Sequence, residues 1–237
     1  MIFKVHEDRI IYSKEPGNPL EYTSELDKAY SKYAKLYDVA VKFLPVWKTW
    51  IRSAIPHLEG ERVLEVSFGT GYLMTHYAAE HETHGIDFNS DMIEIARENL
   101  YRQGIEANLQ WGNVENLPYA DNYFDTVINT MAFSGYPNGQ KAMAELHRVL
   151  KEGGKLILID FDYPADRNLL GYWLTRFMEF SGDVIKDISS VLQAFPFDFT
   201  EEEIGGFGSV HLYQARKLAN CDRVQLHDTR PQVTPPG

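Results

Sequence analysis

The feature that most constrains the fold of this chain is a regular alternation of short apolar segments with helix-like ones between residues 62 and 161. The helix-like segments repeat apolar side chains at helical spacing, as Met92, Ala96 and Leu100 do at four-residue intervals. Strands that alternate with helices predict an α/β chain with a parallel sheet and right-handed crossovers. The expected strands are 62–66, 83–87, 108–111, 124–129 and 155–161.

Helices are expected between these strands. The glycine-containing segment that follows the first strand should lead into a helix that continues to about residue 79. Asn89 or Ser90 can cap the next helix, because either side chain can accept a hydrogen bond from a free backbone N–H. A third helix is expected from about residue 139 to residue 151, and Gly153 and Gly154 should end it in a left-handed turn.

The C-terminal part of the sequence completes the sheet. Two strand-like runs, 197–203 and 207–216, are joined by Gly205 and Gly206, and this pattern predicts a hairpin. One strand of such a hairpin must run antiparallel to an otherwise parallel sheet. We therefore predict a doubly wound, Rossmann-like α/β fold with a mostly parallel seven-stranded sheet and helical cap segments.

Aromatic-rich helical segments flank the predicted sheet. Residues 24–55 carry the first, which Pro45 should divide into two helices, and residues 164–195 carry the second. The C-terminal residues are polar and contain several prolines, as mobile tails do. We predict an N-terminal loop with cap helices over 1–55, an α/β domain over 56–219 with a helical cap insertion at 164–195, and a flexible tail over 220–237.

Charge and composition exclude several classes of protein. The 237 residues include 34 acidic and 23 basic side chains, a formal net charge of −11, whereas nucleic-acid binding needs clustered basic residues. No apolar run approaches the ~20 residues that span a bilayer, and His6, Glu7 and Asp8 lie where a signal peptide would be apolar. Cys221 is the only cysteine, which excludes a disulfide framework. We expect a cytoplasmic protein without a nucleic-acid partner or an integral membrane segment.

The loop after the first predicted strand carries the clearest sign of a ligand site. In a doubly wound sheet the ligand lies at the carboxyl ends of the strands, beside the first strand. Gly69 and Gly71 allow a tight turn close to a ligand. Asp87 ends the second strand, where a carboxylate can bind both hydroxyls of a ribose. The dinucleotide fingerprint needs a third glycine, but Leu73 and Met74 stand there.

Several motifs, in order and spacing, resemble those of class I S-adenosylmethionine (SAM) dependent methyltransferases of the ubiquinone/menaquinone-biosynthesis-like branch. The first motif reads Glu-Val-Ser-Phe-Gly-Thr-Gly, so Ser67 replaces the first glycine of the family. Residues 31–38 are similar to the cap helix of that branch, and the resemblance covers about residues 30–218. The motifs that carry it are 65–71, 85–92, 112–125 and 148–154.

The resemblance implies SAM as cofactor and makes residues 56–219 the SAM-binding methyltransferase domain. It implies that Glu65 orients the methionine ammonium and that Asp87 binds the ribose hydroxyls. The cofactor-binding residues that it implies are Tyr33, Glu65, Ser67, Gly69, Gly71, Asp87, Phe88, Met92, Asn113, Val114, Asn129 and Thr130.

The aromatic cap segments are expected to cover a pocket for the methyl acceptor, which should be small and apolar or amphiphilic. Transfer needs a general base only when the acceptor is protonated at rest. The candidate bases near the expected mouth are Asp160, Asp162, Tyr136 and His211, and the sequence favours none of them as the catalytic residue. The expected substrate-binding residues are Tyr37, Met131, Tyr136, Trp173, Phe177 and His211.

Other functions fit parts of the sequence. A nicotinamide-dependent oxidoreductase would share the fold, but this sequence lacks the third glycine of the dinucleotide fingerprint. A non-catalytic SAM-fold binding or sensor protein is consistent with the replacement of a family glycine by Ser67. No metal is expected, because the histidines at 76, 81 and 84 have no partner at metal-ligand spacing. The expected partner is a small-molecule acceptor, and the aromatic cap is compatible with a homodimer.

Overall fold

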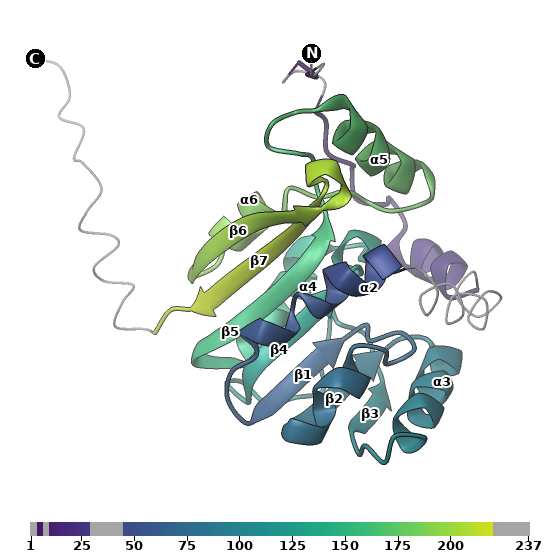
Figure 1. The fold of residues 1–237 in the computed structure, drawn as a ribbon, viewed down its shortest axis with the longest axis vertical. Helices are drawn as coiled ribbons and strands as arrows, with labels where there is room; N and C mark the ends of the chain where they lie inside the picture. The colour runs from purple at the N-terminus through teal and green to yellow at the C-terminus, as the bar shows by residue number, and fades with distance from the viewer. Residues whose placement is uncertain (1–3, 7–9, 29–44, 220–237) are drawn as a thin grey trace, which may run out of the picture.

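The computed structural model describes residues 4–6, 10–28 and 45–219, and its strands form a seven-stranded sheet in the order β3-β2-β1-β4-β5-β7-β6 (Figure 1). The neighbours from β3 through β5 pair in parallel, and β7 runs antiparallel to both β5 and β6. The predicted fold class is therefore confirmed. The strands are β1 (Arg62–Val66), β2 (Glu82–Asp87), β3 (Asn108–Trp111), β4 (Phe124–Thr130), β5 (Leu150–Phe161), β6 (Phe197–Gly205) and β7 (Val210–Lys217).

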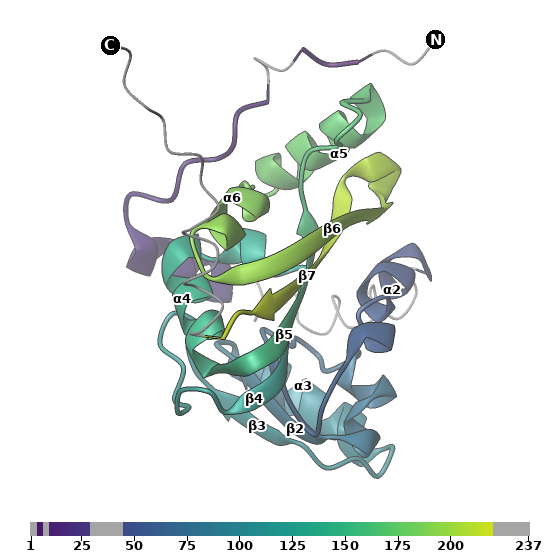
Figure 2. The same ribbon diagram turned by 90° about the vertical axis from the view of Figure 1, so that its left-hand side faces the viewer.

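Helices cover both faces of the sheet, as Figure 2 shows from the side, with α4 and α6 on one face and α2 and α3 on the other. The segment 19–28 is also helical as far as the structure describes it. The remaining helices are α2 (Pro45–Arg52), α3 (Ser90–Tyr101), α4 (Gly139–Val149), α5 (Leu169–Phe180) and α6 (Ile188–Gln193).

Two buried clusters form the core, one on each face of the sheet. Side chains alternate between the faces along a strand, so Leu156 and Leu158 of β5 join the cluster beneath α4 and α6. Ile157 and Ile159 join the cluster that includes the buried side chains of α3. A continuous apolar strand is therefore needed at the centre of this sheet, because both of its faces are covered.

The helices begin at side-chain caps. Asn89 Oδ1 accepts from Met92 N at 2.9 Å and begins α3, one of the two caps that the sequence offered. Asn138 and Asn168 cap α4 and α5 in the same way. Each such bond satisfies a backbone donor that has no partner within the helix.

Two predicted helical features are wrong. The segment after the first strand forms only the 3-10 turns Met74–His76 and Ala78–Glu80, because Tyr77 leaves helical geometry with φ −135° and places its hydroxyl on Glu65. The helix α4 ends at Val149, not at residue 151. Leu150 already pairs with Phe124 in the sheet, and the Lys217 ammonium donates to the carbonyl of Leu150.

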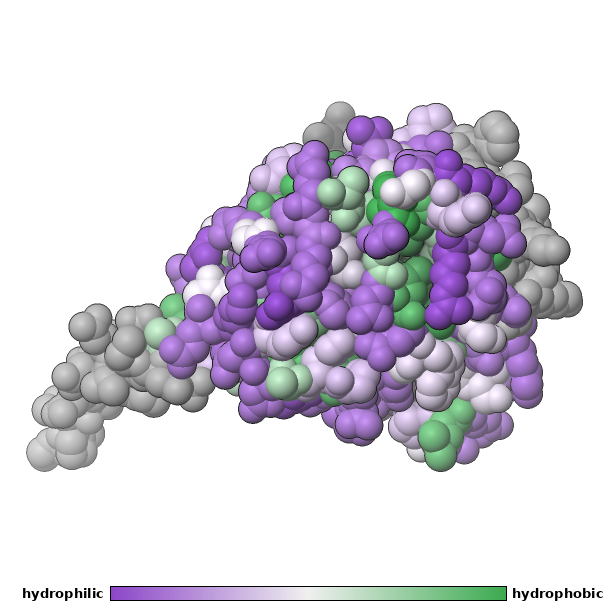
Figure 3. All heavy atoms as spheres, turned by 90° about the horizontal axis from the view of Figure 1, so that it is seen from below, coloured by the Kyte–Doolittle hydropathy of each residue, from purple (hydrophilic) through white to green (hydrophobic). Residues whose placement is uncertain are grey.

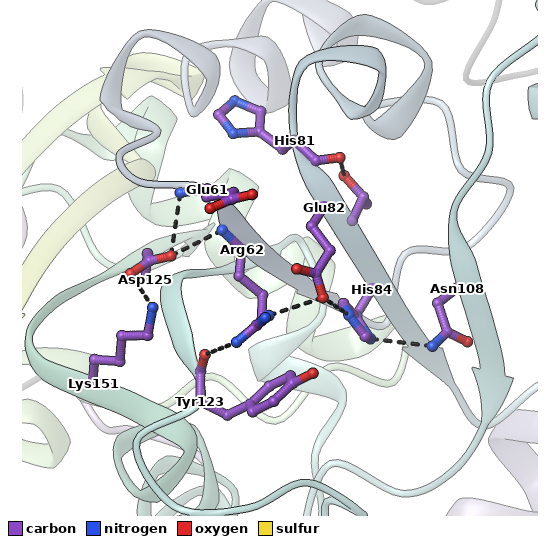
Figure 4. Close-up of polar contacts among 10 residues, drawn as sticks. Glu61, Arg62, His81, Glu82, His84, Asn108, Tyr123, Asp125 and Lys151 are labelled. Carbon is purple, nitrogen blue, oxygen red and sulfur yellow. Dashed lines mark hydrogen bonds and ion pairs between the residues drawn. The ribbon is translucent and has the colours of Figure 1, made fainter.

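A polar network lies at the amino ends of the strands, opposite the edge where a doubly wound sheet binds ligands (Figure 4). The Asp125 carboxylate accepts from Arg62 N at 2.9 Å and pairs with Lys151. The Arg62 guanidinium donates to Glu82 at 2.9 Å and lies 4.1 Å from the centre of the Tyr123 ring. These contacts join the start of β1 to β2, β4 and β5, so this edge of the sheet is held by polar contacts among the strands themselves.

Candidate functional site

The loop that follows β1 has an unusual backbone. Ser67, Gly69 and Gly71 have φ values of 53°, 54° and 70°, in the left-handed region that favours glycine. A Cβ at Gly71 would lie 2.9 Å from the Ala96 Cβ of α3, so glycine also permits close packing there. Ser67 has a Cβ and adopts this conformation at an energetic cost. The glycine that the family has at this position is thus explained by the backbone.

Asp87 lies at the carboxyl end of β2 and is buried. Its two carboxylate oxygens accept from Gly69 N and Asn89 N, each at 2.9 Å, so the side chain connects the β1 loop to the start of α3. Burial raises the pKa of Asp87 to about 6, although these backbone N–H groups oppose the shift. Each oxygen keeps a lone pair that can accept from a ligand hydroxyl.

Glu65 lies in β1, two residues before the loop, and is only 2% exposed. Burial raises the pKa of its carboxyl to about 8, while the hydrogen bond from the Tyr77 hydroxyl, 2.9 Å long, partly offsets this effect. A carboxylate that is buried in this way gains strongly from a nearby cation, because the cation replaces the solvation that burial removes.

A single cavity receives both carboxylates. Its empty space, with the open mouth included, is about 790 Å³. The side that contains Glu65 and Asp87 is polar, and the residues contributed by α2 and by the end of β4 are mostly apolar. The lining residues are Leu26, Trp47, Ile51, Glu65, Ser67, Phe68, Gly69, Thr70, Tyr72, Leu73, Asp87, Phe88, Asn89, Met92, Thr130, Met131, Ala132, Gly135 and Tyr136.

A hydrogen-bonded triad connects the β1 loop to the end of β4. Ser67 Oγ lies 2.8 Å from the Tyr136 hydroxyl, which accepts from Asn129 Nδ2 at 2.6 Å. Burial raises the pKa of Tyr136, so its phenol stays neutral. The Ser67 side chain thus fixes the ring of Tyr136 at the cavity wall, an interaction that a glycine at position 67 could not make.

The structure brings about half of the sequence-predicted site residues together. The predicted residues that line the cavity are Glu65, Ser67, Gly69, Asp87, Phe88, Met92, Thr130, Met131 and Tyr136. Asn129 reaches the site only through Tyr136, and Gly71, Asn113 and Val114 are not part of the cavity lining. Tyr33 and Tyr37 lie outside the described residues.

Three residues that the sequence assigned to the acceptor lie elsewhere. Trp173 and Phe177 are 65% and 62% exposed on α5 and do not line the cavity. His211 is buried in β7, where Nδ1 contacts Glu201 at 2.7 Å and Nε2 contacts the Gly208 carbonyl at 2.8 Å. The prediction of a substrate role for these three residues gains no support from the cavity.

The candidate bases are also separated by the fold. The Asp160 carboxylate is fully buried and accepts from Ser134 N at 2.8 Å, which ties the loop after β4 to β5. Asp162 accepts from the Tyr213 hydroxyl at 2.8 Å. Among the four candidates, Tyr136 lines the cavity and the other three do not.

The sequence predicted an aromatic cover for the pocket but did not identify the residues that form the apolar wall of the cavity. Trp47 and Ile51 lie one helical turn apart on α2 and both face the cavity, and Leu26 reaches it from the N-terminal helix. Their i, i+4 spacing was readable, but apolar spacing alone does not tell a cavity wall from core packing. Asp27 accepts from Asn89 Nδ2 at 2.8 Å and fixes the N-terminal helix beside Asp87.

Among the described residues, none of the helices is long and apolar enough to cross a bilayer. Within the same part of the chain, histidine, cysteine and acidic side chains do not gather in groups that could hold a metal ion.

Comparison with known proteins shows which family part of this chain resembles. Residues 64–158 match the family model described as a methyltransferase domain. The ubiquinone/menaquinone biosynthesis C-methyltransferase of Erwinia tasmaniensis is 34% identical over 125 residues, which are 50% of this chain and 50% of that protein. Residues 64–158 of this chain are therefore similar to a methyltransferase domain. The chain spans about half the length of the curated relatives that it matches.

Solved structures of other proteins share the fold. A putative S-adenosyl-L-methionine-dependent methyltransferase from Methanococcus maripaludis has a TM-score of 0.62 and 19% identity, over 80% of this chain and 94% of that one. The YcgJ protein of Bacillus subtilis has a TM-score of 0.61 and 18% identity, over 72% of this chain and 98% of that one. This chain thus shares its fold with these solved structures.

Proposed function

We propose that this chain transfers the methyl group of SAM to a small, apolar or amphiphilic acceptor in the cavity. The observation that carries the proposal is the pair of buried carboxylates, Glu65 and Asp87, that enter one cavity on either side of the left-handed loop. SAM carries an ammonium and a sulfonium as well as a ribose, so a cavity with buried carboxylates matches both its charge and its hydroxyls.

The chain's own residues bind and orient the two reactants. Asp87 accepts from the ribose hydroxyls, Glu65 pairs with the ammonium, and Phe88 and Met92 flank the adenine. When bound, SAM supplies an electrophilic methyl group on a sulfonium. Catalysis then depends on the in-line alignment of the acceptor atom and on the exclusion of water.

The apolar wall limits the class of acceptor. Trp47, Ile51 and Met131 offer no charge to a ligand, and the phenol of Tyr136 can donate or accept a single hydrogen bond. The relatives act, by their names, in ubiquinone and menaquinone biosynthesis. A quinol-like or other aromatic acceptor with an apolar body is therefore the proposed substrate.

The proposal requires no general base from the cavity. Tyr136 is too weak a base to take a proton at neutral pH, because it is held as a neutral phenol. The acceptor atom must therefore be nucleophilic in its resting state, as an ionised phenol or an electron-rich ring carbon is.

The domain boundaries at 55 and 219 and the cap role of 164–195 remain predictions.

Calorimetric titration with S-adenosylhomocysteine, with NADH as control, tests the cofactor, and transfer of a labelled methyl group to a panel of acceptors tests the reaction. We expect micromolar binding of S-adenosylhomocysteine alone, and transfer to quinols but not to highly charged acceptors. Binding without transfer to any acceptor would favour the non-catalytic reading, and transfer only to charged acceptors would refute the apolar acceptor.

A further inference from the structure

The helix α5 presents an apolar surface to solvent. Half of the large apolar side chains that are exposed in the described residues lie on α5 or beside it, and each is between 62% and 89% exposed. The face at the other end of the molecule, seen from below in Figure 3, is mostly hydrophilic and shows only separate apolar spots. The α5 patch consists of Leu170, Trp173, Phe177, Phe180 and Phe207.

The inner face of α5 is apolar as well. Tyr172, Leu174 and Met178 pack against the core cluster, and Gly171 lets the helix approach the Phe207 carbonyl, 2.4 Å from where a Cβ would be. A helix that is apolar on all sides is normally buried in a core or between chains. The outer face of α5 therefore has the character of a surface that is covered in the working protein.

Phe207 is held in a conformation that its own side chain disfavours. Its φ is 57°, which is rare for a bulky residue, and it lies between Gly206 and Gly208. Asn168, the cap of α5, donates from Nδ2 to the Phe207 carbonyl at 2.8 Å and fixes the turn against the helix. The surrounding contacts thus hold a strained backbone that exposes the Phe207 ring to water. Such strain is typical of functional positions, which indicates that the ring contacts a partner.

The charges around the patch favour a second copy of the chain over an anionic membrane. The charged side chains of α5, Arg176 and Glu179, pair with each other, so the patch carries no net charge. The chain as a whole has a formal net charge of −11, which opposes binding to anionic lipid. In a twofold interface the same patch of both copies comes together, so a patch with a net charge would face a patch of like charge. A neutral patch avoids this repulsion between the two copies.

The area of the patch is sufficient for a dimer. A fully buried aromatic side chain covers about 150–250 Å². At the exposures found here, the four aromatic side chains alone leave about 550 Å² in water, and Leu170 adds to this. A standard interface buries about 800 Å² on each partner, so this patch with a modest polar rim reaches that size.

We propose that the α5 patch packs against the same patch of a second copy, and that the protein is a twofold homodimer. None of the five patch residues lines the cavity. The dimer therefore goes beyond the methyl-transfer proposal, and either proposal can fail without the other.

Sedimentation velocity of the full chain from 1 to 100 µM tests this inference. The wild type should sediment with twice the mass of one 27.2 kDa chain. Phe177→Glu and Trp173→Glu should each weaken association at least tenfold, because each buries a charge beside its symmetry mate. Tyr101→Glu, at an exposed aromatic position on α3, is the matched control and should leave the dimer unchanged.

Circular dichroism and binding of S-adenosylhomocysteine report whether each variant is folded. A wild type that stays monomeric at 100 µM would overturn the proposal. So would a wild-type dimer whose association is weakened equally by Phe177→Glu and by Tyr101→Glu. A monomer that cosediments with phosphatidylcholine vesicles through Phe177 would also overturn it and assign the patch to a lipid surface.

Discussion

Binding of the SAM amino group should release a proton from Glu65. In the structure the pKa of this carboxyl is raised to about 8 by burial, so at pH 7 about 0.9 of the molecules carry the proton. An ammonium beside Glu65 favours the carboxylate, because opposite charges at close range lower the pKa of an acid. Binding of S-adenosylhomocysteine, which keeps this amino group, should therefore expel close to one proton.

The same linkage gives the pH dependence of the affinity. Below the pKa of Glu65 the protonated form competes with the ligand, so binding should strengthen about fiftyfold from pH 6 to pH 8. The affinity rises with pH because Glu65 must lose its proton when the ammonium binds, and a higher pH removes that proton beforehand. An ordinary carboxyl, ionised well below pH 6, would give no slope in this range.

Calorimetry at pH 7 in two buffers of different ionisation enthalpy measures the number of protons released. Glu65→Gln should release none and bind more weakly. Glu61→Gln, which removes an exposed carboxylate just before the same strand, should behave as the wild type. Proton release that is zero in the wild type, or that persists in Glu65→Gln, would refute the assignment of Glu65 to the amino group.

Three further predictions concern Asp87, Ser67 and His211. Asp87→Ala removes a charged acceptor and should weaken S-adenosylhomocysteine binding by about 1.5–3 kcal/mol, roughly ten- to 150-fold, and an unchanged dissociation constant would mean that the site is misplaced. Ser67→Gly relieves about 1–2 kcal/mol of left-handed strain and loses a hydrogen bond to Tyr136 of about 1 kcal/mol. In urea unfolding it should therefore be at least as stable as the wild type, whereas Ser67→Ala, which keeps the strain, should be less stable. His211 contacts an oxygen at each ring nitrogen and its pKa is raised, so folding favours the imidazolium, in which both nitrogens carry protons. Its contribution to the free energy of unfolding should be fully present below pH 6.5 and lost as the pH rises through the raised pKa, and a pH profile that is the same in His211→Gln would contradict this.

The sheet was predictable because buried strands need continuous apolar runs. The run at 155–161 is apolar on both faces, as a strand covered on both sides requires, and it forms the C-terminal part of β5. The loop and the acid of the site were predictable for a related reason. A tight turn at a strand end needs glycine, and Asp87 follows directly from its place at the end of β2.

The expectations that the structure contradicts or does not support depend on contacts between distant segments. A helix was expected to reach residue 79, but the buried hydrogen bond from Tyr77 to Glu65 requires another backbone path. Trp173 and Phe177 were assigned to the acceptor pocket because α5 is apolar. Since α5 is apolar on both faces, its sequence does not determine which face turns inward.

Ser67 shows a third kind of limit. The sequence identified it as a departure from the family's glycine, but the consequence depends on Tyr136, which lies 69 residues later in the chain. Only the fold brings the two hydroxyls within 2.8 Å and reveals that this departure adds a contact to the cavity wall.

A crystal structure of the protein with S-adenosylhomocysteine tests the central claim most directly. The account predicts that the ligand fills the cavity, with both ribose hydroxyls within hydrogen-bond distance of Asp87, the amino group beside Glu65, and the sulfur toward Met131 and Tyr136. A ligand bound elsewhere on the chain, or one whose ribose does not contact Asp87, would contradict the account.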